Sequence, residues 1–157
     1  MYYLTVVLLM FVLPIGSILL EHFAFPNPVA LLLVFGKWFV FWAVGARLLL
    51  AGLRQAIQPR FTAETILGIK GDASLHVVQE LGFANISIGV IGLISIFSSA
   101  WVMPAAIAGC LFYCFAGIRH VVQRNRNALE NTAMASDLFI FVVLAAYVII
   151  ALAEGSR

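Results

Sequence analysis

Five long apolar stretches, separated by short polar segments, limit the fold of this chain more than any other feature. Each is close to the roughly 20 residues that a helix needs to cross the hydrocarbon core of a bilayer. Of the 157 residues, 64% are hydrophobic and 10% are charged, which leaves too few polar side chains to cover a soluble domain. The sequence therefore predicts an all-α transmembrane bundle forming a single domain over residues 1–157. The expected spans are Leu4–Leu20, Val29–Leu53, Val77–Phe97, Val102–Val122 and Ala133–Ala153.

The connections between the stretches support a count of five. One helix over Val77–Val122 would be about 70 Å long, so the chain is expected to fold back at Ser98–Pro104. The first stretch lacks the basic region of a signal peptide, and we expect it to be retained as a helix. The substantial polar segment, Arg54–Leu75, predicts a short helix lying at the membrane surface.

Basic residues in the connections predict the orientation. With five spans, the N-terminus shares one side of the membrane with the polar segments 54–75 and 119–134. Outside the spans, the opposite side carries only Arg157. Because basic residues are enriched in cytoplasmic loops, we expect a cytoplasmic N-terminus and a C-terminus outside. The basic residues on the expected cytoplasmic side are Arg54, Arg60, Lys70, Arg119, Arg124 and Arg126.

Two basic residues, Lys37 and Arg47, lie inside the second span. Charged side chains at membrane depth are costly, so each requires an explanation. One interpretation is that each side chain extends to its nearer interface, and we favour this for Lys37. For Arg47 the alternative is that it faces the bundle and pairs with an acid.

The topology brings two acids, Glu80 and Asp137, to the same depth as Arg47, together with Arg119 and His120. The binding hypothesis is that these five residues form one polar cluster at the cytoplasmic boundary, where a polar head group could dock. The structural alternative is that the positive N-terminal ends of their helices stabilise the two carboxylates. Glu80 could also pair with His76, four residues earlier.

Small residues on the third span are expected to form a packing face. Asn85, Gly89 and Gly92 share one side of this helix, and small residues let two helices approach closely. The fourth span offers Gly109 and Gly117, so the two helices are predicted to pack as a tight hairpin, with Asn85 available for a hydrogen bond across the contact.

The sequence predicts no metal site and no cofactor. His76, Glu80 and His120 lack the spacing of a known ligand motif, although a haem bound by His76 and His120 is an alternative. Cys110 and Cys114 lie four residues apart on one helix, where a disulfide would be strained, so we interpret them as packing residues. Catalytic sequence motifs are absent, and a net charge of +2 without a basic run argues against nucleic-acid binding.

Two sequence segments resemble the DoxX-like group and related uncharacterised small bacterial membrane proteins. They are Arg47-Leu48-Leu49-Leu50-Ala51-Gly52-Leu53 and, after a polar amphipathic stretch, Glu80-Leu81-Gly82-Phe83-Ala84-Asn85, which opens an apolar helix. The resemblance covers about residues 47–122. It implies a compact bundle in the bacterial inner membrane, often of unknown role. The chain differs from the group in its extra N-terminal segment and in placing Arg47 inside a helix.

Two functions are compatible with these features. The first is a non-enzymatic accessory or assembly subunit that contacts a membrane-protein partner or forms a homo-oligomer, because catalytic motifs are absent and the loops are minimal. The second is a binder or carrier of a small amphipathic molecule, such as a lipid, a quinone or an organic anion, held by Arg47 and the residues around it.

Overall fold

The computed structural model describes residues 2–25 and 30–155, and this part of the chain contains helices and connections but no strand. Five helical segments are long and apolar enough to cross a membrane, which confirms the predicted fold class. A short π-helical segment, η3 (Phe61–Ile66), occupies the polar connection that was expected to hold a surface helix. The five spans are Tyr2–Ala24, Leu31–Ile57, Asp72–Ile94, Ser99–Val122 and Ala128–Glu154.

Two spans begin five residues earlier than their predicted apolar stretches, at Asp72 and Ala128 instead of Val77 and Ala133. Helix α5 (Asp72–Ile94) starts at an acidic residue, and α7 (Ala128–Gly155) starts directly after Asn127, whose side chain accepts a hydrogen bond from the Glu130 backbone N–H at 2.9 Å. Polar residues are favoured at helix starts because the first N–H groups lack partners within the helix. Val29, the predicted start of the second span, and Arg157, the basic residue expected on the outer side, lie outside the described residues.

The first span contains a π-helical turn next to its proline. It runs as α1 (Tyr2–Val7), η1 (Leu8–Val12) and α2 (Leu13–Ala24), and the Leu13 N–H bonds to the Leu8 carbonyl five residues earlier. Pro14 follows, and its ring nitrogen cannot donate a hydrogen bond within the helix. The proline is thus accommodated by a local change in helix type.

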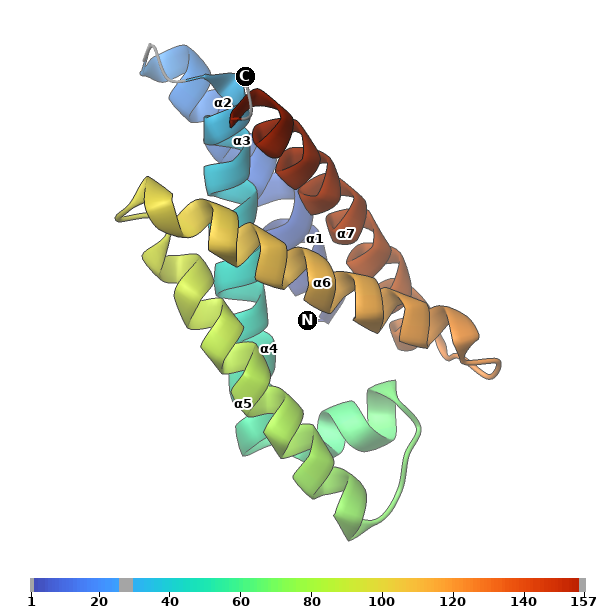
Figure 1. Cartoon of the computed structure of the whole chain (residues 1–157). Helices are drawn as coiled ribbons and strands as arrows, with labels where there is room; N and C mark the ends of the chain where they lie inside the picture. The colour runs from blue at the N-terminus through green and yellow to red at the C-terminus, as the bar shows by residue number, and fades with distance from the viewer. Residues whose placement is uncertain (1, 26–29, 156–157) are drawn as a thin grey trace.

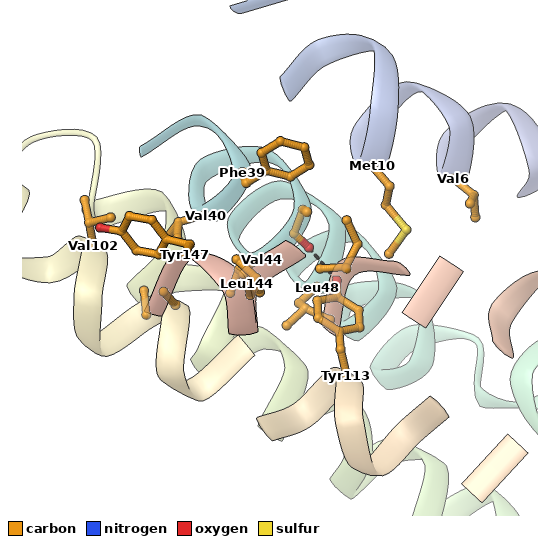
Figure 2. Close-up of a cluster of buried hydrophobic side chains, with 14 residues drawn as sticks. Val6, Met10, Phe39, Val40, Val44, Leu48, Val102, Tyr113, Leu144 and Tyr147 are labelled. Carbon is orange, nitrogen blue, oxygen red and sulfur yellow. Dashed lines mark hydrogen bonds between the residues drawn. The ribbon is translucent and has the colours of Figure 1, made fainter. Parts of the chain in front are cut away.

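The second span is the centre of the bundle. It consists of α3 (Leu31–Phe39), η2 (Val40–Ala46) and α4 (Arg47–Ile57), and 44% of its apolar window is buried, against 22–33% for the other spans. Figure 2 shows its buried side chains between those of the first, fourth and fifth spans. The Tyr113 hydroxyl donates a hydrogen bond to the Ala43 carbonyl within η2. The core side chains labelled there are Val6, Met10, Phe39, Val40, Val44, Leu48, Val102, Tyr113, Leu144 and Tyr147.

The second and third spans contact each other through glycine. A Cβ atom on Gly89 would lie 2.5 Å from the Leu49 backbone nitrogen, and one on Gly92 would lie 2.6 Å from the Gly45 nitrogen. Nearer the end of α4, a Cβ on Gly52 would lie 2.6 Å from the carbonyl oxygen of Gly82. The two backbones therefore touch along a continuous glycine seam, as small residues permit in membrane helices.

The predicted packing partner of Gly89 and Gly92 was wrong. These glycines meet the second span, whereas α5 and α6 (Val102–Val122) diverge from their shared connection, which includes the short 3-10 helix η4 (Ser99–Trp101) (Figure 1). Helix α5 packs on the second span because Gly45 and Gly52, seven residues apart, give that span a face as flat as the glycine face of α5. The glycines of α6 also have other partners. A Cβ on Gly109 would meet the Val44 side chain, and one on Gly117 would meet Leu138 of α7.

The ends of the helices separate into two groups. In Figure 1, the end of α2 and the C-terminal end of α7 lie together at the top, whereas η3, the end of α4 and the start of α5 lie at the bottom. The connection between α6 and α7 joins the η3 group, because the Asn127 amide donates to the carbonyls of Thr65 and Ile66 at 2.9 and 3.1 Å. This arrangement agrees with five spans that cross the membrane in alternating directions.

Lys37 has a direct partner, in contrast to the predicted extension to the interface. Its Nζ lies 2.5 Å from Oε2 of Glu21 on α2, and the Trp38 indole donates to the same carboxylate oxygen at 2.6 Å. An acid within reach satisfies the charge locally, which costs less than burying the ammonium alone. The pair joins α2 to α3, two helices that Figure 1 shows at the end of the bundle opposite η3.

Candidate functional site

A cavity of about 670 Å³ lies inside the bundle, at the end where η3 is found. Residues of α1, α4, η3, α5, α6 and α7 line it, so all four other spans and η3 contribute to its walls around α4. Its volume falls within the range of about 300–1,000 Å³ that is typical of small-molecule sites. Helix α5 packs along α4, and α6 packs along α7. The cavity lies in the space that these two pairs of helices leave between them.

Arg47 forms the inner end of this cavity. It follows the π-helical turn η2, and its backbone N–H bonds to the Trp42 carbonyl five residues earlier. Arg47 precedes the end of α4 at Ile57 by ten residues, about 15 Å along the helix axis, which places it well inside the span. π-Helical turns are frequent at functional sites, where they redirect the side chains that follow.

The Arg47 side chain is incompletely satisfied. Its Nε is buried and has no hydrogen-bond partner among the described residues. The guanidinium forms a side-chain hydrogen bond with Tyr2 and interacts electrostatically with Asp137 and Tyr113, but within the described part of the chain it forms no direct ion pair. A buried guanidinium nitrogen with an unused donor is unfavourable unless another group completes its hydrogen bonding.

His120 lies between two buried carboxylates beside Arg47. Its Nδ1 is 3.2 Å from Oε1 of Glu130, and its Nε2 is 3.9 Å from Oδ2 of Asp137. Glu130 and Asp137 are only 3% and 8% exposed, and they lie seven residues apart on the same face of α7. Buried charges persist when they are paired, so this cluster gives the inner part of the cavity a fixed polar lining.

Basic residues line the end of the cavity next to η3, which we call its mouth. The Arg54 guanidinium stacks 3.5 Å above the centre of the Phe61 ring, which couples α4 to η3. Arg119 lines the opposite wall, where it donates to the Gln123 side chain at 3.1 Å. Asn127 then holds η3 across the mouth through the carbonyls of Thr65 and Ile66.

The substitution Asn127→Ala is expected to release η3 from the mouth of the cavity. It removes both hydrogen bonds to η3 and the cap of α7, each contributing about 1 kcal/mol, so amide exchange within residues 61–66 should accelerate by about tenfold. Hydrogen–deuterium exchange with peptide-level mass spectrometry measures this. Asn131→Ala is the matched control, because Asn131 accepts only from Arg126 in the connection and should leave η3 unchanged. Equal exchange in both variants would contradict the role of Asn127.

The side walls of the cavity are apolar and partly open. Leu50 on α4 and Phe115 on α6 line the cavity although they are 51% and 67% exposed, and Leu81 on α5 is exposed as well. Figure 1 shows α5 and α6 spreading apart on this side. The cavity therefore opens laterally between α5 and α6, towards the surface that would face lipid in a membrane.

Asn85 contributes a second unsatisfied atom to the wall. It is 2% exposed, and its Nδ2 donates to Oε1 of Gln55 at 2.8 Å, whereas its Oδ1 has no hydrogen-bond partner among the described residues. The predicted hydrogen bond across a helix contact thus forms with the second span instead of the fourth.

The structure brings together four of the five residues in the predicted cluster. Arg47, Arg119, His120 and Asp137 line the cavity, whereas Glu80 is exposed on α5 and takes no part in it. Glu80 lies two residues from Gly82, about 200° around the helix, so the glycine seam directs it away from the cavity. Three lining residues of the inner cluster were not identified from the sequence: Tyr2, Tyr113 and Glu130.

A signal for Glu130 was present in the sequence. Asn127 and Glu130 have the spacing of a capping box, which marks the start of a helix and would have extended α7 to include the glutamate. The tyrosines carry no such signal. Their involvement depends on the way in which α1 and α6 pack around η2.

The haem alternative gains no geometric support. His76 is exposed on α5 and does not line the cavity that contains His120. Cys110 and Cys114 are free thiols. Among the described residues, no group of three or more His, Cys, Asp or Glu side chains is arranged to hold a metal ion.

The chain belongs to DUF6790, a family of unknown function whose model matches residues 1–157. A comparison with curated proteins finds no match, and a comparison with solved structures finds none. The family match does not test the resemblance to DoxX-like proteins, which stays a prediction.

Proposed function

We propose that this member of the DUF6790 family binds a small amphipathic molecule in the cavity beside Arg47. The observation that carries the proposal is the buried, unpartnered Nε of Arg47 at the inner end of a cavity whose side walls are apolar. A ligand with a hydrogen-bond acceptor in its polar head would satisfy this donor, and its apolar part would contact Leu48, Leu50 and Phe112.

The charge of the lining supports a head group that accepts hydrogen bonds. Three arginines, Arg47, Arg54 and Arg119, and two carboxylates, Glu130 and Asp137, line the cavity. With His120 neutral, the positive charges exceed the negative ones by one. Glu130 lies within hydrogen-bonding distance of His120, and the arginines are charged donors on the lining that an acceptor on a ligand can contact.

The proposed membrane orientation places the mouth of the cavity in the cytoplasm. Arg54 and Arg119 lie at the mouth, and Arg60, Lys70, Arg124 and Arg126 belong to the connections at the same end, as the excess of basic residues on the cytoplasmic side requires. The proposed compartment is the bacterial inner membrane. A cysteine introduced at Lys70 should react with an impermeant maleimide only after the cells are opened; labelling of intact cells would reverse the orientation.

The test of binding is native mass spectrometry of the protein purified in a mild membrane mimetic, with identification of any molecule that stays bound. The wild-type protein is expected to retain one small molecule per chain. The variant Ala116→Leu, which adds side-chain volume to the cavity wall, is expected to lose it while keeping its charge cluster. Equal retention by both would place the molecule elsewhere and contradict the proposal.

The accessory-subunit function rests on sequence features alone, namely the minimal loops and the absence of catalytic motifs. The same experiment distinguishes it. Retention of a protein partner or a stable homo-oligomer, with no small molecule in the wild-type cavity, would favour the accessory function over ligand binding.

A further inference from the structure

We infer that the ligand is an anionic lipid, whose carboxylate or phosphate head occupies the cavity while its acyl chain leaves between α5 and α6 into the bilayer. This inference rests on the proposed function and specifies the ligand class and the entry route. It depends on three properties of the cavity: its lateral opening, its depth and the distribution of its charges.

The lateral opening has the chemistry of a passage for an acyl chain. Its rim consists of Leu50, Leu81 and Phe115, one from each of α4, α5 and α6, and all three are exposed while they line the cavity. The rim side chains are therefore apolar on both sides, towards the cavity and towards the surrounding lipid. Water-soluble ligands do not require such an opening, because the basic mouth beside η3 already gives access from the aqueous side.

The depth of the cavity fits a head group that moves below the membrane surface. Arg54 near the end of α4 and Arg47 seven residues earlier are separated by about 10 Å along the helix, and both line the cavity. They share one face of the helix, since seven residues complete almost two turns. A head group can thus contact Arg54 first and Arg47 after it has moved inward, while the acyl chain stays in contact with lipid.

The charges select an anion over a neutral head. His120 lies 3.2 Å from Glu130 and 3.9 Å from Asp137, whereas the Arg47 guanidinium has a buried, unused donor and no direct ion pair within the described residues. Carboxylates and phosphates accept short, charge-assisted hydrogen bonds from guanidinium, which neutral hydroxyls do not match. The lipids that share this chemistry include fatty acids and lysophospholipids with a terminal phosphate.

The test uses a series of probes that vary the head and the tail separately. Binding to the purified protein is measured by native mass spectrometry for oleate, 1-oleoyl lysophosphatidate, neutral monoolein and the tail-free anions acetate and inorganic phosphate. Oleate and lysophosphatidate are expected to bind at least tenfold more tightly than monoolein, and the tail-free anions are expected to show no binding.

Two variants test the lateral opening. Leu50→Trp narrows the rim and is expected to weaken oleate binding by at least tenfold. Leu53→Trp is its matched control, because Leu53 is exposed on the same helix but does not line the cavity, and it should bind oleate like the wild type. Thermal unfolding of both variants establishes that they are equally folded.

The outcomes separate the inference from the proposed function. If acetate or phosphate binds as tightly as oleate and Leu50→Trp has no effect, the ligand is a soluble anion, and the lipid inference fails while cavity binding stands. If monoolein binds as tightly as oleate, the anionic head is wrong. If no probe binds and the wild-type protein retains no molecule, the proposed function itself fails.

Discussion

Replacing Arg47 by glutamine is expected to weaken ligand binding by about tenfold to a hundredfold. The reason is that a hydrogen bond between a charged donor and an anionic acceptor contributes about 1.5–3 kcal/mol, and each 1.4 kcal/mol corresponds to a factor of ten in affinity. Arg47 is the group at the inner end of the cavity with an unused buried donor. The measurement is the dissociation constant for oleate, together with the amount of the co-purifying molecule per chain.

The matched control for this substitution is Arg60→Gln. It removes the same charge from an exposed side chain that lies 3.8 Å from Glu64 and does not line the cavity, so affinity should stay at the wild-type value. Arg47→Lys keeps the charge but loses the planar, five-donor geometry of guanidinium. Its affinity for the ligand is expected to lie between those of Arg47→Gln and Arg60→Gln. Wild-type affinity in a folded Arg47→Gln protein would show that Arg47 does not hold the head group.

The substitution Gly92→Ala is expected to destabilise the protein by about 1–3 kcal/mol, the usual effect of overpacking a close contact. The added methyl group would lie 2.6 Å from the backbone nitrogen of Gly45 and 2.7 Å from its Cα. Both are backbone atoms, so the helices must separate to make room. Reversible unfolding in mixed micelles, followed by circular dichroism, measures the change in the free energy of unfolding.

Gly16→Ala provides the control for the glycine seam. Gly16 lies within α2, and a Cβ at this position would meet nothing within 4 Å. Alanine is favoured over glycine in a helix by about 1 kcal/mol, so this variant should be neutral or slightly stabilised. A Gly92→Ala protein as stable as Gly16→Ala would mean that the two helices are further apart than the seam requires.

The sequence was sufficient to predict the spans because their determinants are local. Apolar length fixes where each helix lies, and the alternation of five spans across a membrane fixes which ends meet. The sequence therefore placed Arg47, His120 and Asp137 in one region, and all three line the cavity. The separation of 3.9 Å between His120 and Asp137 follows from this alternation, since His120 lies in the last turn of α6 and Asp137 in the first part of α7.

The side of each helix that faces its neighbours was harder to predict. Glu80 was predicted at the correct depth but on the wrong face of α5. The rotation of α5 about its own axis is set by the glycine seam with α4, and this rotation directs Glu80 away from the cavity. The seam itself was missed for a related reason. Gly45 and Gly52 are separated from Gly82 and Gly89 by the polar connection, and the adjacent hairpin of the third and fourth spans was the simpler expectation.

The cavity could not have been predicted from the sequence at all. It results from two helix pairs that diverge, and divergence depends on the summed packing of η2, α6 and α7 around residues such as Val44 and Leu144. The sequence shows that Arg47 is a charged residue inside a span. That its Nε lacks a hydrogen-bond partner is a property of the assembled structure.

The most direct test of cavity binding is an experimental structure of the protein in lipid nanodiscs, determined by electron cryomicroscopy with a rigid antibody fragment to aid alignment. We expect density for a small molecule in the cavity, with its polar end in hydrogen-bonding contact with Arg47 and its apolar end at the opening between α5 and α6. A closed cavity in which α5 packs against α6, or an Arg47 side chain that faces lipid, would contradict it.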